Sequence, residues 1–219
     1  MGSVIGTTTS VAVDLVIFTV RDGLLQVLLV RRDPPPFAGT WALPGGPVGP
    51  RETLETAARR ELGEKTGLDD VYLEQLYTFG DPDRDPRGRT VTVAYYALIQ
   101  SGRVRADESV SWFPAARPPR LAFDHAKILG TGVRRLRAKL EYTTVGFQLL
   151  PPKFTLTDLQ NLYETILGKR LDKRNFRKKV LSLNLLRPHR EKRAEGAHRP
   201  AQLYSFKLGK MMVLEGQIV

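Results

Sequence analysis

Three charged positions on one predicted helix are spaced to act on an anionic ligand. The segment 46–68 reads GPVGPRETLETAARRELGEKTGL and places Glu61, Glu64 and Lys65 at positions i, i+3 and i+4. Side chains at this spacing share one helix face, where carboxylates can hold Mg²⁺ against a diphosphate. The third position is a lysine, whose ammonium at about 4 Å repels a divalent ion by about 8 kcal/mol at an effective dielectric of about 20. A divalent ion held by Glu61 and Glu64 would therefore be opposed by Lys65.

The same three positions have other interpretations. They would also suit an ordinary solvated helix face, and Lys65 follows Glu61 in the order that favours a helical ion pair. Weak residual Mg²⁺ binding through Glu61 and Glu64 is a further alternative. We expect that no metal or other cofactor is required.

A second group of charged residues lies in the segment 80–89, GDPDRDPRGR, between two predicted strands. Guanidinium groups give bidentate hydrogen bonds to phosphate oxygens, and carboxylates accept hydrogen bonds from ribose hydroxyls. A proline-stiffened, self-compensating hairpin is the alternative, and spacing alone does not separate the two. Phe37 or Trp41 is a candidate for stacking an adenine, whereas we interpret His125 as a capping or surface histidine. The candidate ligand-binding residues are Arg31, Arg32, Trp41, Gly45, Gly46, Asp81, Arg84, Asp85 and Arg87.

The basic residues of the chain are concentrated in its last third. Residues 151–219 hold 15 Lys and Arg against 6 Asp and Glu, a net charge of +9, whereas residues 1–150 hold 19 against 17, a net charge of +2. A positive field of this size favours polyanionic partners. We therefore expect the final third to bind nucleic acid.

Alternating strands and helices position the first two groups of residues. Segments 11–20 and 24–30 predict a hairpin around Arg21-Asp22-Gly23, and segments 71–79 and 90–99 predict a second strand pair. Helices are predicted over 52–66, ending at Gly67, and over 124–141. One compact unit with this order predicts a mixed sheet flanked by helices.

The final third has the pattern of two short helices followed by a hairpin. A capping-box-like start at Thr155 opens the first helix, and Asp172 is the expected N-cap of the second. The second helix displays basic residues, and a hairpin wing is expected between Leu185 and Phe206. The alternative is that these basic residues form a solvated face or a surface that binds protein or RNA. The candidate DNA-binding residues are Lys173, Arg174, Asn175, Arg177, Lys178, Lys179, Arg187, Arg190, Lys192 and Arg193.

Length and composition limit the classes of protein to which this chain can belong. At 219 residues, the chain suits one medium domain and one small domain, and it has no cysteine for a disulfide, a thiolate zinc site or a nucleophile. We read no signal peptide and no membrane span, so we expect a cytoplasmic protein. The predicted division is an effector-binding domain over 1–142, a linker over 143–153 and a DNA-binding domain over 154–219.

The segment 46–68 resembles the Nudix box. Eight of its positions fit: Gly46, Glu52, Arg60, Glu61, Leu62, Glu64, Gly67 and Leu68. The resemblance implies an α/β fold, a Nudix α/β/α sandwich with a mixed sheet. It also implies that Lys65 replaces a glutamate that ligates metal in the family, so the degenerate box Glu52, Arg60, Glu61, Glu64 and Lys65 leaves no residue that we assign as catalytic.

A degenerate Nudix-like domain followed by a small winged helix-turn-helix domain resembles the NrtR family, the Nudix-related transcriptional regulators of NAD metabolism. The resemblance implies a homodimeric repressor of NAD biosynthesis genes that binds a palindromic double-stranded DNA operator. It implies release by ADP-ribose, or a related nucleotide, bound to the Nudix-like domain. Two alternatives stay open: an active Mg²⁺-dependent ADP-ribose pyrophosphatase, and a related regulator that senses a sugar.

Overall fold

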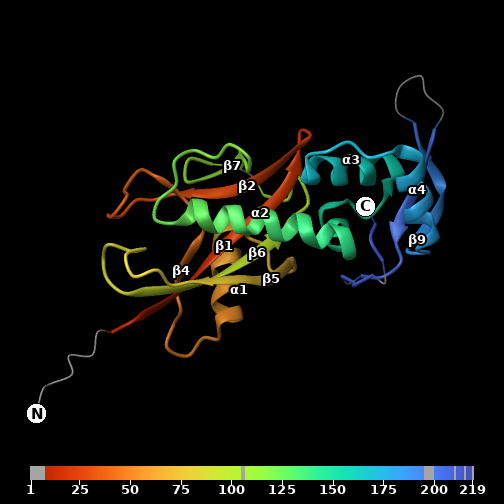
Figure 1. The fold of residues 1–219 in the computed structure, drawn as a ribbon. Coiled ribbons are helices and arrows are strands. Elements are labelled where there is room, and N and C mark those ends of the chain that lie inside the picture. Colours follow the sequence, from red (N-terminus) through yellow and green to blue (C-terminus); the bar gives the residue numbers. More distant parts are fainter. Residues whose placement is uncertain (1–7, 105–106, 195–199, 210, 215, 219) are drawn as a thin grey trace, which may run out of the picture. The chain divides into compact units, whose positions relative to one another are not determined.

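The computed structural model describes residues 8–104, 107–194, 200–209, 211–214 and 216–218 (Figure 1). The described residues fall into two compact units, one within 8–18 and 26–133 and the other within 19–25 and 134–218. Its elements are, in order, β1 (Ser10–Arg21), β2 (Leu24–Arg31), β3 (Trp41–Ala42), β4 (Gly45–Pro47), α1 (Leu54–Thr66), β5 (Tyr72–Phe79), β6 (Thr90–Leu98), β7 (Val110–Pro114), α2 (His125–Tyr142), the 3₁₀ helix η1 (Val145–Leu149), β8 (Phe154–Thr155), α3 (Leu156–Leu167), α4 (Lys173–Ser182), β9 (Leu186–Arg193) and β10 (Ala201–Phe206).

A mixed sheet forms the frame of the first unit. Its strands lie in the order β3-β2-β1-β6-β5, with β4 paired to β1 and β7 paired to β2. The central pair, β1 and β6, is parallel, whereas β4, β5 and β7 pair antiparallel with their neighbours. The predicted mixed α/β fold is therefore confirmed.

Both faces of strand β1 are buried because its side chains alternate between two helices. Val13, Leu15 and Ile17 belong to a core cluster that also contains Ala58 and other residues of α1. The opposite face carries Val16 and Phe18 toward the first half of α2. A Cβ placed on Gly132 of α2 would lie only 3.1 Å from Val16 Cγ1, so this glycine lets the helix approach the sheet closely. Figure 1 shows α1 and α2 on opposite faces of the sheet.

Helix α1 starts two residues later than the sequence predicted. The Thr53 hydroxyl accepts a hydrogen bond from Thr56 N at 3.1 Å and serves as the N-cap. Glu52 consequently lies outside the helix, and its carboxylate contacts the side chain of Arg60 from a later turn. The predicted C-terminal glycine, Gly67, adopts the left-handed conformation with φ of 68°.

The second unit has the predicted helix, turn, helix and hairpin. Thr155 and Asp158 form a reciprocal capping box at the start of α3, and Asp172 caps α4 through Asn175 N at 2.7 Å. Strands β9 and β10 form the wing, and β8 completes a three-stranded sheet in the order β8-β10-β9. No helix in the described ranges is long and apolar enough to cross a lipid bilayer.

The segment 143–153, which we predicted as a linker, is largely packed. It contains η1, whose Val145 and Phe147 are buried. Near the end of the chain, Met212 O accepts from Thr144 N at 3.0 Å, and Leu214 N donates to Tyr142 O at 2.8 Å. The exact domain limits remain a prediction.

Candidate functional site

A cavity of about 540 Å³ opens beside β1 in the first unit, and six of the nine predicted ligand-binding residues line it. These six are Arg32, Gly45, Gly46, Arg84, Asp85 and Arg87. They come from the end of β2, from β4 and from the segment 80–89, which the sheet brings together. The wall also contains Asp14, Phe123 and His125, which the sequence analysis did not select.

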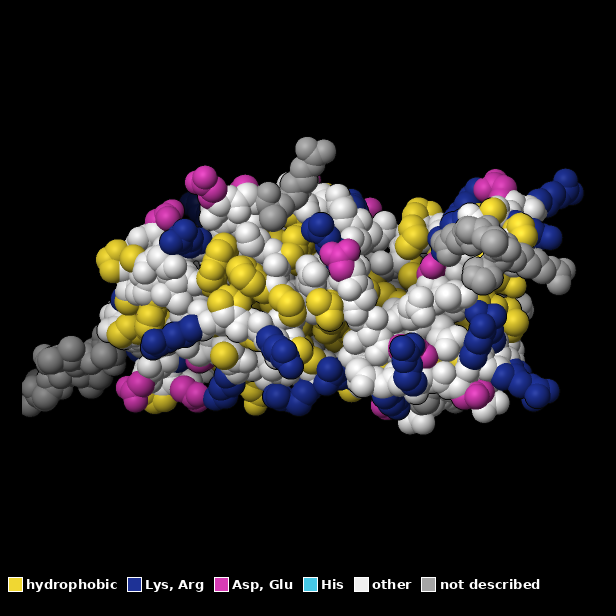
Figure 2. Space-filling view, turned by 90° about the horizontal axis from the view of Figure 1, so that it is seen from above, with side chains coloured by type: hydrophobic (Ala, Val, Ile, Leu, Met, Phe, Trp, Pro, Cys, Tyr) yellow, Lys and Arg dark blue, Asp and Glu magenta, His cyan; other side chains and the backbone are white. Residues whose placement is uncertain are grey.

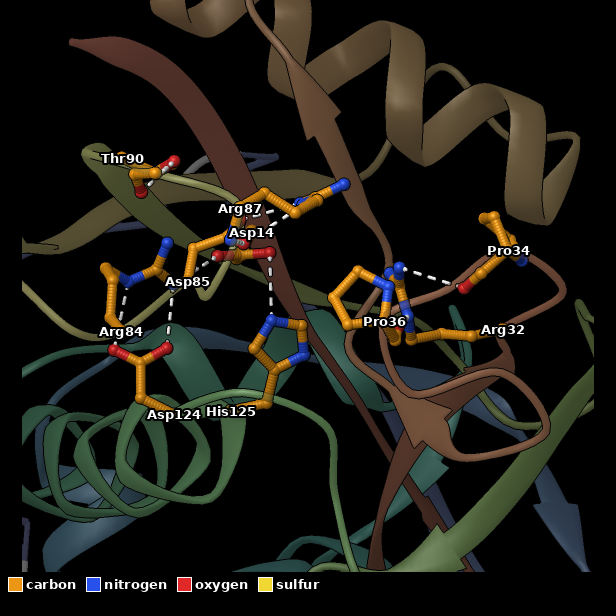
Figure 3. A network of polar contacts seen from close by, with 11 residues as sticks. Asp14, Arg32, Pro34, Pro36, Arg84, Asp85, Arg87, Thr90, Asp124 and His125 are labelled. Carbon is orange, nitrogen blue, oxygen red and sulfur yellow. Dashed lines mark hydrogen bonds and ion pairs between the residues drawn. The ribbon is translucent and has the colours of Figure 1, made fainter. Parts of the chain in front are cut away.

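Arg84 is the centre of a buried ion network rather than a free phosphate donor (Figure 3). Its Nε and Nη2 donate to the two carboxylate oxygens of Asp124 at 3.1 and 2.7 Å, and Nη2 lies 3.3 Å from Asp14 Oδ2. Only 4% of the Arg84 side chain is exposed. With both neighbouring carboxylates satisfied by one guanidinium, we conclude that this arginine shapes the cavity wall.

His125 begins helix α2 and is buried, so our interpretation of it as a capping or surface histidine is wrong. Its Nδ1 accepts from Leu43 N at 2.9 Å, and its Nε2 faces Asp14 Oδ1 at 3.5 Å. Burial lowers the pKa of this imidazole, and the nearby Asp14 carboxylate opposes that effect. The neutral ring with a proton on Nε2 satisfies both contacts.

Arg87 and Arg32 converge on one aromatic ring at the cavity. The guanidinium carbon of Arg32 lies 4.7 Å from the centroid of Phe123, and that of Arg87 lies 5.5 Å from it. Arg87 forms a bidentate pair with Asp85, at 3.0 and 2.6 Å, and hydrogen bonding to this guanidinium holds the pKa of Asp85 below its usual range. Cations over an aromatic face are attracted by the ring quadrupole, so Phe123 positions both side chains.

The remaining three candidates lie outside the cavity wall. Asp81 forms a surface ion pair with Lys127 at 2.6 Å, and Arg31 is exposed at the end of β2. Trp41 packs edge-on against Phe113 with ring centroids 4.8 Å apart. The structure therefore places Trp41 in a packing contact and not in this cavity.

The box residues meet at the guanidinium of Arg60. Its Nε and Nη2 contact the two oxygens of Glu52 at 2.7 and 3.1 Å, while Nη1 contacts Glu61 at 2.7 Å and Glu64 at 3.5 Å. The hydrogen bonds from Arg60 and from Gly49 N lower the pKa of Glu52 to about 2. Glu61 is buried against Gly46, where an added Cβ would lie within van der Waals overlap of its Oε1.

Lys65 does not form the predicted ion pair with Glu61 among the contacts of the described residues. The Glu61 carboxylate turns toward Arg60 instead, and Lys65 is exposed on the helix surface. The guanidinium of Arg60, and not Lys65, thus compensates the charge of the box carboxylates. Within the described ranges, no three Asp, Glu, His or Cys side chains are grouped to hold a metal ion. Lys65 stands where the family has a metal-ligating glutamate, and Arg60 bonds the other carboxylates of the box, so these residues do not fit the Mg²⁺ site that the fold family implies.

The basic residues of the second unit divide into paired and outward-facing groups. Arg177 donates to Thr157 Oγ1 at 2.9 Å, and Arg193 pairs with Asp158 at 2.7 Å, so both bind residues of α3. Lys179 is half-buried on α4. Lys and Arg side chains project from the α4 and β9 end of this unit (Figure 2). The exposed members of the predicted set are Lys173, Arg174, Asn175, Lys178, Arg187, Arg190 and Lys192.

Comparisons with known proteins match each unit separately. Residues 8–131 match the NUDIX domain model, and residues 146–206 match the NrtR DNA-binding winged helix domain model. The ADPR responsive transcriptional repressor NtrR of Acinetobacter baylyi is 42% identical over 204 residues, which span 90% of this chain and 81% of the relative.

Two crystal structures of an NrtR protein superpose on this chain. Shewanella oneidensis NrtR complexed with a 27mer DNA superposes with a TM-score of 0.83 at 40% identity, over 90% of this chain and 93% of that one. The NUDIX domain of Shewanella oneidensis NrtR complexed with ADP ribose superposes with a TM-score of 0.53 at 38% identity, over 62% of this chain and 94% of that one. A Nudix domain joined to an NrtR winged helix, with this similarity across nearly the whole chain, shows that the chain belongs to the NrtR family.

Proposed function

We propose that this chain is an ADP-ribose-responsive transcriptional repressor that uses its second unit to bind operator DNA and its first unit to sense the nucleotide. The proposal is supported by one combination: a NUDIX cavity lined with guanidinium groups and an NrtR winged helix in the same chain. A relative that covers most of the chain is itself named an ADPR responsive repressor. Such a repressor acts in the cytoplasm, where a bacterial chromosome lies.

The effector half of the proposal rests on the chemistry of the cavity. We assign ADP-ribose contacts to Arg32, Arg87 and the backbone of Gly45 and Gly46, all of which line the wall. Carboxylates such as Asp85 suit ribose hydroxyls, and guanidinium groups suit a diphosphate. Since the box does not fit Mg²⁺, we propose that ADP-ribose is bound as a signal and leaves intact.

The DNA half of the proposal rests on α4 and the wing. On α4, the exposed Lys173, Arg174 and Lys178 would contact DNA phosphates and base edges. On β9, Arg187 and Arg190 would contact the DNA backbone. We propose a homodimer, because two recognition helices about 34 Å apart read a palindromic operator. Genes of NAD biosynthesis are the proposed targets.

A DNA-binding assay with the full chain tests this function. The duplex is selected by the purified protein from a random library, and its mobility is followed with and without ADP-ribose. We expect a protein–DNA complex of retarded mobility that dissociates when ADP-ribose is added. A complex that ignores every NAD-related nucleotide would refute the sensor, and failure to select any duplex would refute the repressor.

Active ADP-ribose hydrolysis is the second candidate, because four charged residues of the Nudix box are retained, Glu52, Arg60, Glu61 and Glu64. Product formation is measured with Mg²⁺ and with Mn²⁺ and compared with a Glu61→Gln variant. Turnover that is lost in this variant would favour the enzyme. If the chain is a repressor, the unchanged protein should form no more product than the Glu61→Gln variant does. The change expected to restore a metal ligand is then Lys65→Glu.

A further inference from the structure

The first turn of helix α3 binds a side chain from each of the two elements that we propose to contact DNA. Arg177 of α4 donates from Nη2 to Thr157 Oγ1 at 2.9 Å. Arg193, at the end of β9, donates from Nη2 to Asp158 Oδ1 at 2.7 Å. Although the sequence predicted both arginines to bind DNA, these bonds connect α4 and the wing to one turn of α3.

Asp158 is held so that each of its carboxylate oxygens has a separate partner. Its Oδ2 accepts from Thr155 N at 2.7 Å, and Asp158 N donates to Thr155 Oγ1 at 3.1 Å, which closes the capping box. Burial raises the pKa of Asp158, but the hydrogen bonds from Arg193 and Thr155 outweigh burial and lower it, so the carboxylate is charged near neutral pH. The cap therefore fixes the direction in which Oδ1 meets Arg193.

The wing reaches α3 through both of its strands. Strand β10 pairs with β8 through Leu203 and Thr155, and Thr155 is the N-cap of α3. Strand β9 lies at the edge of this sheet, in the order β8-β10-β9, and its last residue is Arg193. The pair of Arg193 with Asp158 thus connects the outer strand of the wing to α3, whereas main-chain pairing connects the inner strand.

We propose that Asp158 and Arg193 are positioning residues for DNA binding, and that their ion pair holds the wing at the angle to α3 at which the exposed arginines of β9 reach the DNA backbone. Arg193 acts through the wing and does not itself contact a phosphate. The inference rests on the proposed function. Holding the wing in place before DNA arrives reduces the conformational entropy that binding would otherwise cost. It also gives a reason for a carboxylate in a unit that binds a polyanion, where negative charge alone would weaken binding.

Replacing Asp158 by asparagine separates positioning from simple charge. Asp158→Asn keeps an oxygen that accepts from Thr155 N but removes the charge that binds Arg193. The matched control is Glu191→Gln, which removes one negative charge from an exposed pair with Lys153 on the same wing. The affinity of the full chain, without nucleotide, is measured by fluorescence anisotropy on a duplex that the unchanged protein selects from a random library.

The two changes should have different effects on DNA affinity. We expect Asp158→Asn to weaken binding about fivefold, the upper range for a partly exposed ion pair, and Glu191→Gln to leave it unchanged or up to about twofold stronger. Unchanged or stronger binding in Asp158→Asn, or equal weakening in both variants, would overturn the inference alone. Failure of the unchanged protein to select any duplex would overturn the proposed function.

A double variant shows whether Arg193 itself contacts DNA. Arg193→Met combined with Asp158→Asn removes one positive and one negative charge, so the net charge of the unit does not change. Because the two residues act as a pair, we expect the double variant to bind about fivefold more weakly than the unchanged protein, no worse than Asp158→Asn alone, with the same slope of log affinity against log salt. A slope reduced by about 0.9 would show that Arg193 neutralises a phosphate and would overturn its positioning role.

Thermal unfolding separates positioning from folding. Asp158→Asn keeps the hydrogen bond that caps α3, so we expect this variant to be fully folded at the temperature of the DNA titration. Asp158→Ala removes the cap together with the ion pair and should unfold at a lower temperature than Asp158→Asn. Weaker DNA binding that appears only where Asp158→Asn begins to unfold would assign the effect to stability and overturn the inference.

Discussion

The two units use arginine and lysine in opposite ways. In the first unit, buried or half-buried guanidinium groups meet carboxylates: Arg60 meets Glu52 and Glu61, and Arg84 meets Asp14 and Asp124. In the second unit, Arg193 pairs with Asp158 and Arg170 pairs with Glu164, but the outer face of α4 keeps its positive charge. The net charges of +2 for residues 1–150 and +9 for residues 151–219 reflect this difference.

The difference teaches what kind of anion each unit suits. Internal pairing fixes the shape of a small cavity and leaves few charges to attract polyanions at long range, which suits one compact nucleotide. Unpaired surface charge releases counterions from a polyphosphate backbone and binds it with little demand on shape. Composition alone does not distinguish these roles, because the partners of each charge decide them.

Removing the buried guanidinium of the first unit should have the largest effect. Arg84→Met leaves Asp14 and Asp124 without their shared partner, so we expect the free energy of unfolding to fall by about 3–5 kcal/mol in chemical denaturation. The matched control is Arg59→Met, which breaks an exposed pair with Glu55 and should cost less than about 1 kcal/mol. Similar losses for both variants would contradict the contrast between buried and exposed pairs.

Charge removal on α4 should act on DNA and not on stability. The double change Arg174→Ala and Lys178→Ala should lower DNA affinity about 10- to 100-fold and reduce the slope of log affinity against log salt by about 2. The control removes two exposed charges from the first unit, at Arg51 and Arg59. If the control changes the salt slope equally, net charge and not position governs binding.

Acid should destabilise the first unit through His125. Its folded pKa lies below 6.5, so as the pH falls below that value the unfolded chain takes up a proton that the folded protein does not. The free energy of unfolding should therefore decline below pH 6.5, by at most about 1.4 kcal/mol per pH unit, until the folded pKa is reached. His125→Asn, which keeps an acceptor for Leu43 N, should flatten this part of the curve. Parallel curves for the two proteins would argue against a neutral buried imidazole.

The smallest expected effect tests the acidic residues of the second unit. Asp172→Ala removes the N-cap of α4 and should lower the free energy of unfolding by about 1 kcal/mol, whereas Asp172→Asn should retain the cap. Denaturant unfolding measures both. Equal destabilisation by the two changes would mean that the carboxylate charge, and not the cap, stabilises the helix.

Regular elements were predictable from the sequence because local chemistry determines them. The long strands, both helices of the second unit, and Gly67 and Asp172 as caps were all confirmed. The two- to five-residue strands β3, β4, β7 and β8 were missed, since so few residues carry no periodic pattern and pair only through the tertiary fold.

The cavity was only partly predictable for a related reason. The segment 80–89 supplied Arg84 and Arg87. Arg87 pairs with Asp85 in the same segment, whereas the partners of Arg84, Asp14 and Asp124, lie 70 and 40 positions away. One signal was present: Asp14 interrupts an otherwise apolar strand predicted to be buried, and a buried charge needs a partner. Phe123 and Asp124 gave no comparable signal, because their roles depend on where helix α2 begins.

Fluorescence anisotropy of a labelled, library-selected duplex, followed in EDTA during addition of ADP-ribose, tests the central claim most directly. We predict that anisotropy falls to the value of free DNA while the nucleotide is recovered intact. Retained anisotropy at saturating ADP-ribose, or release that occurs only when Mg²⁺ is added and the nucleotide is cleaved, would contradict the account.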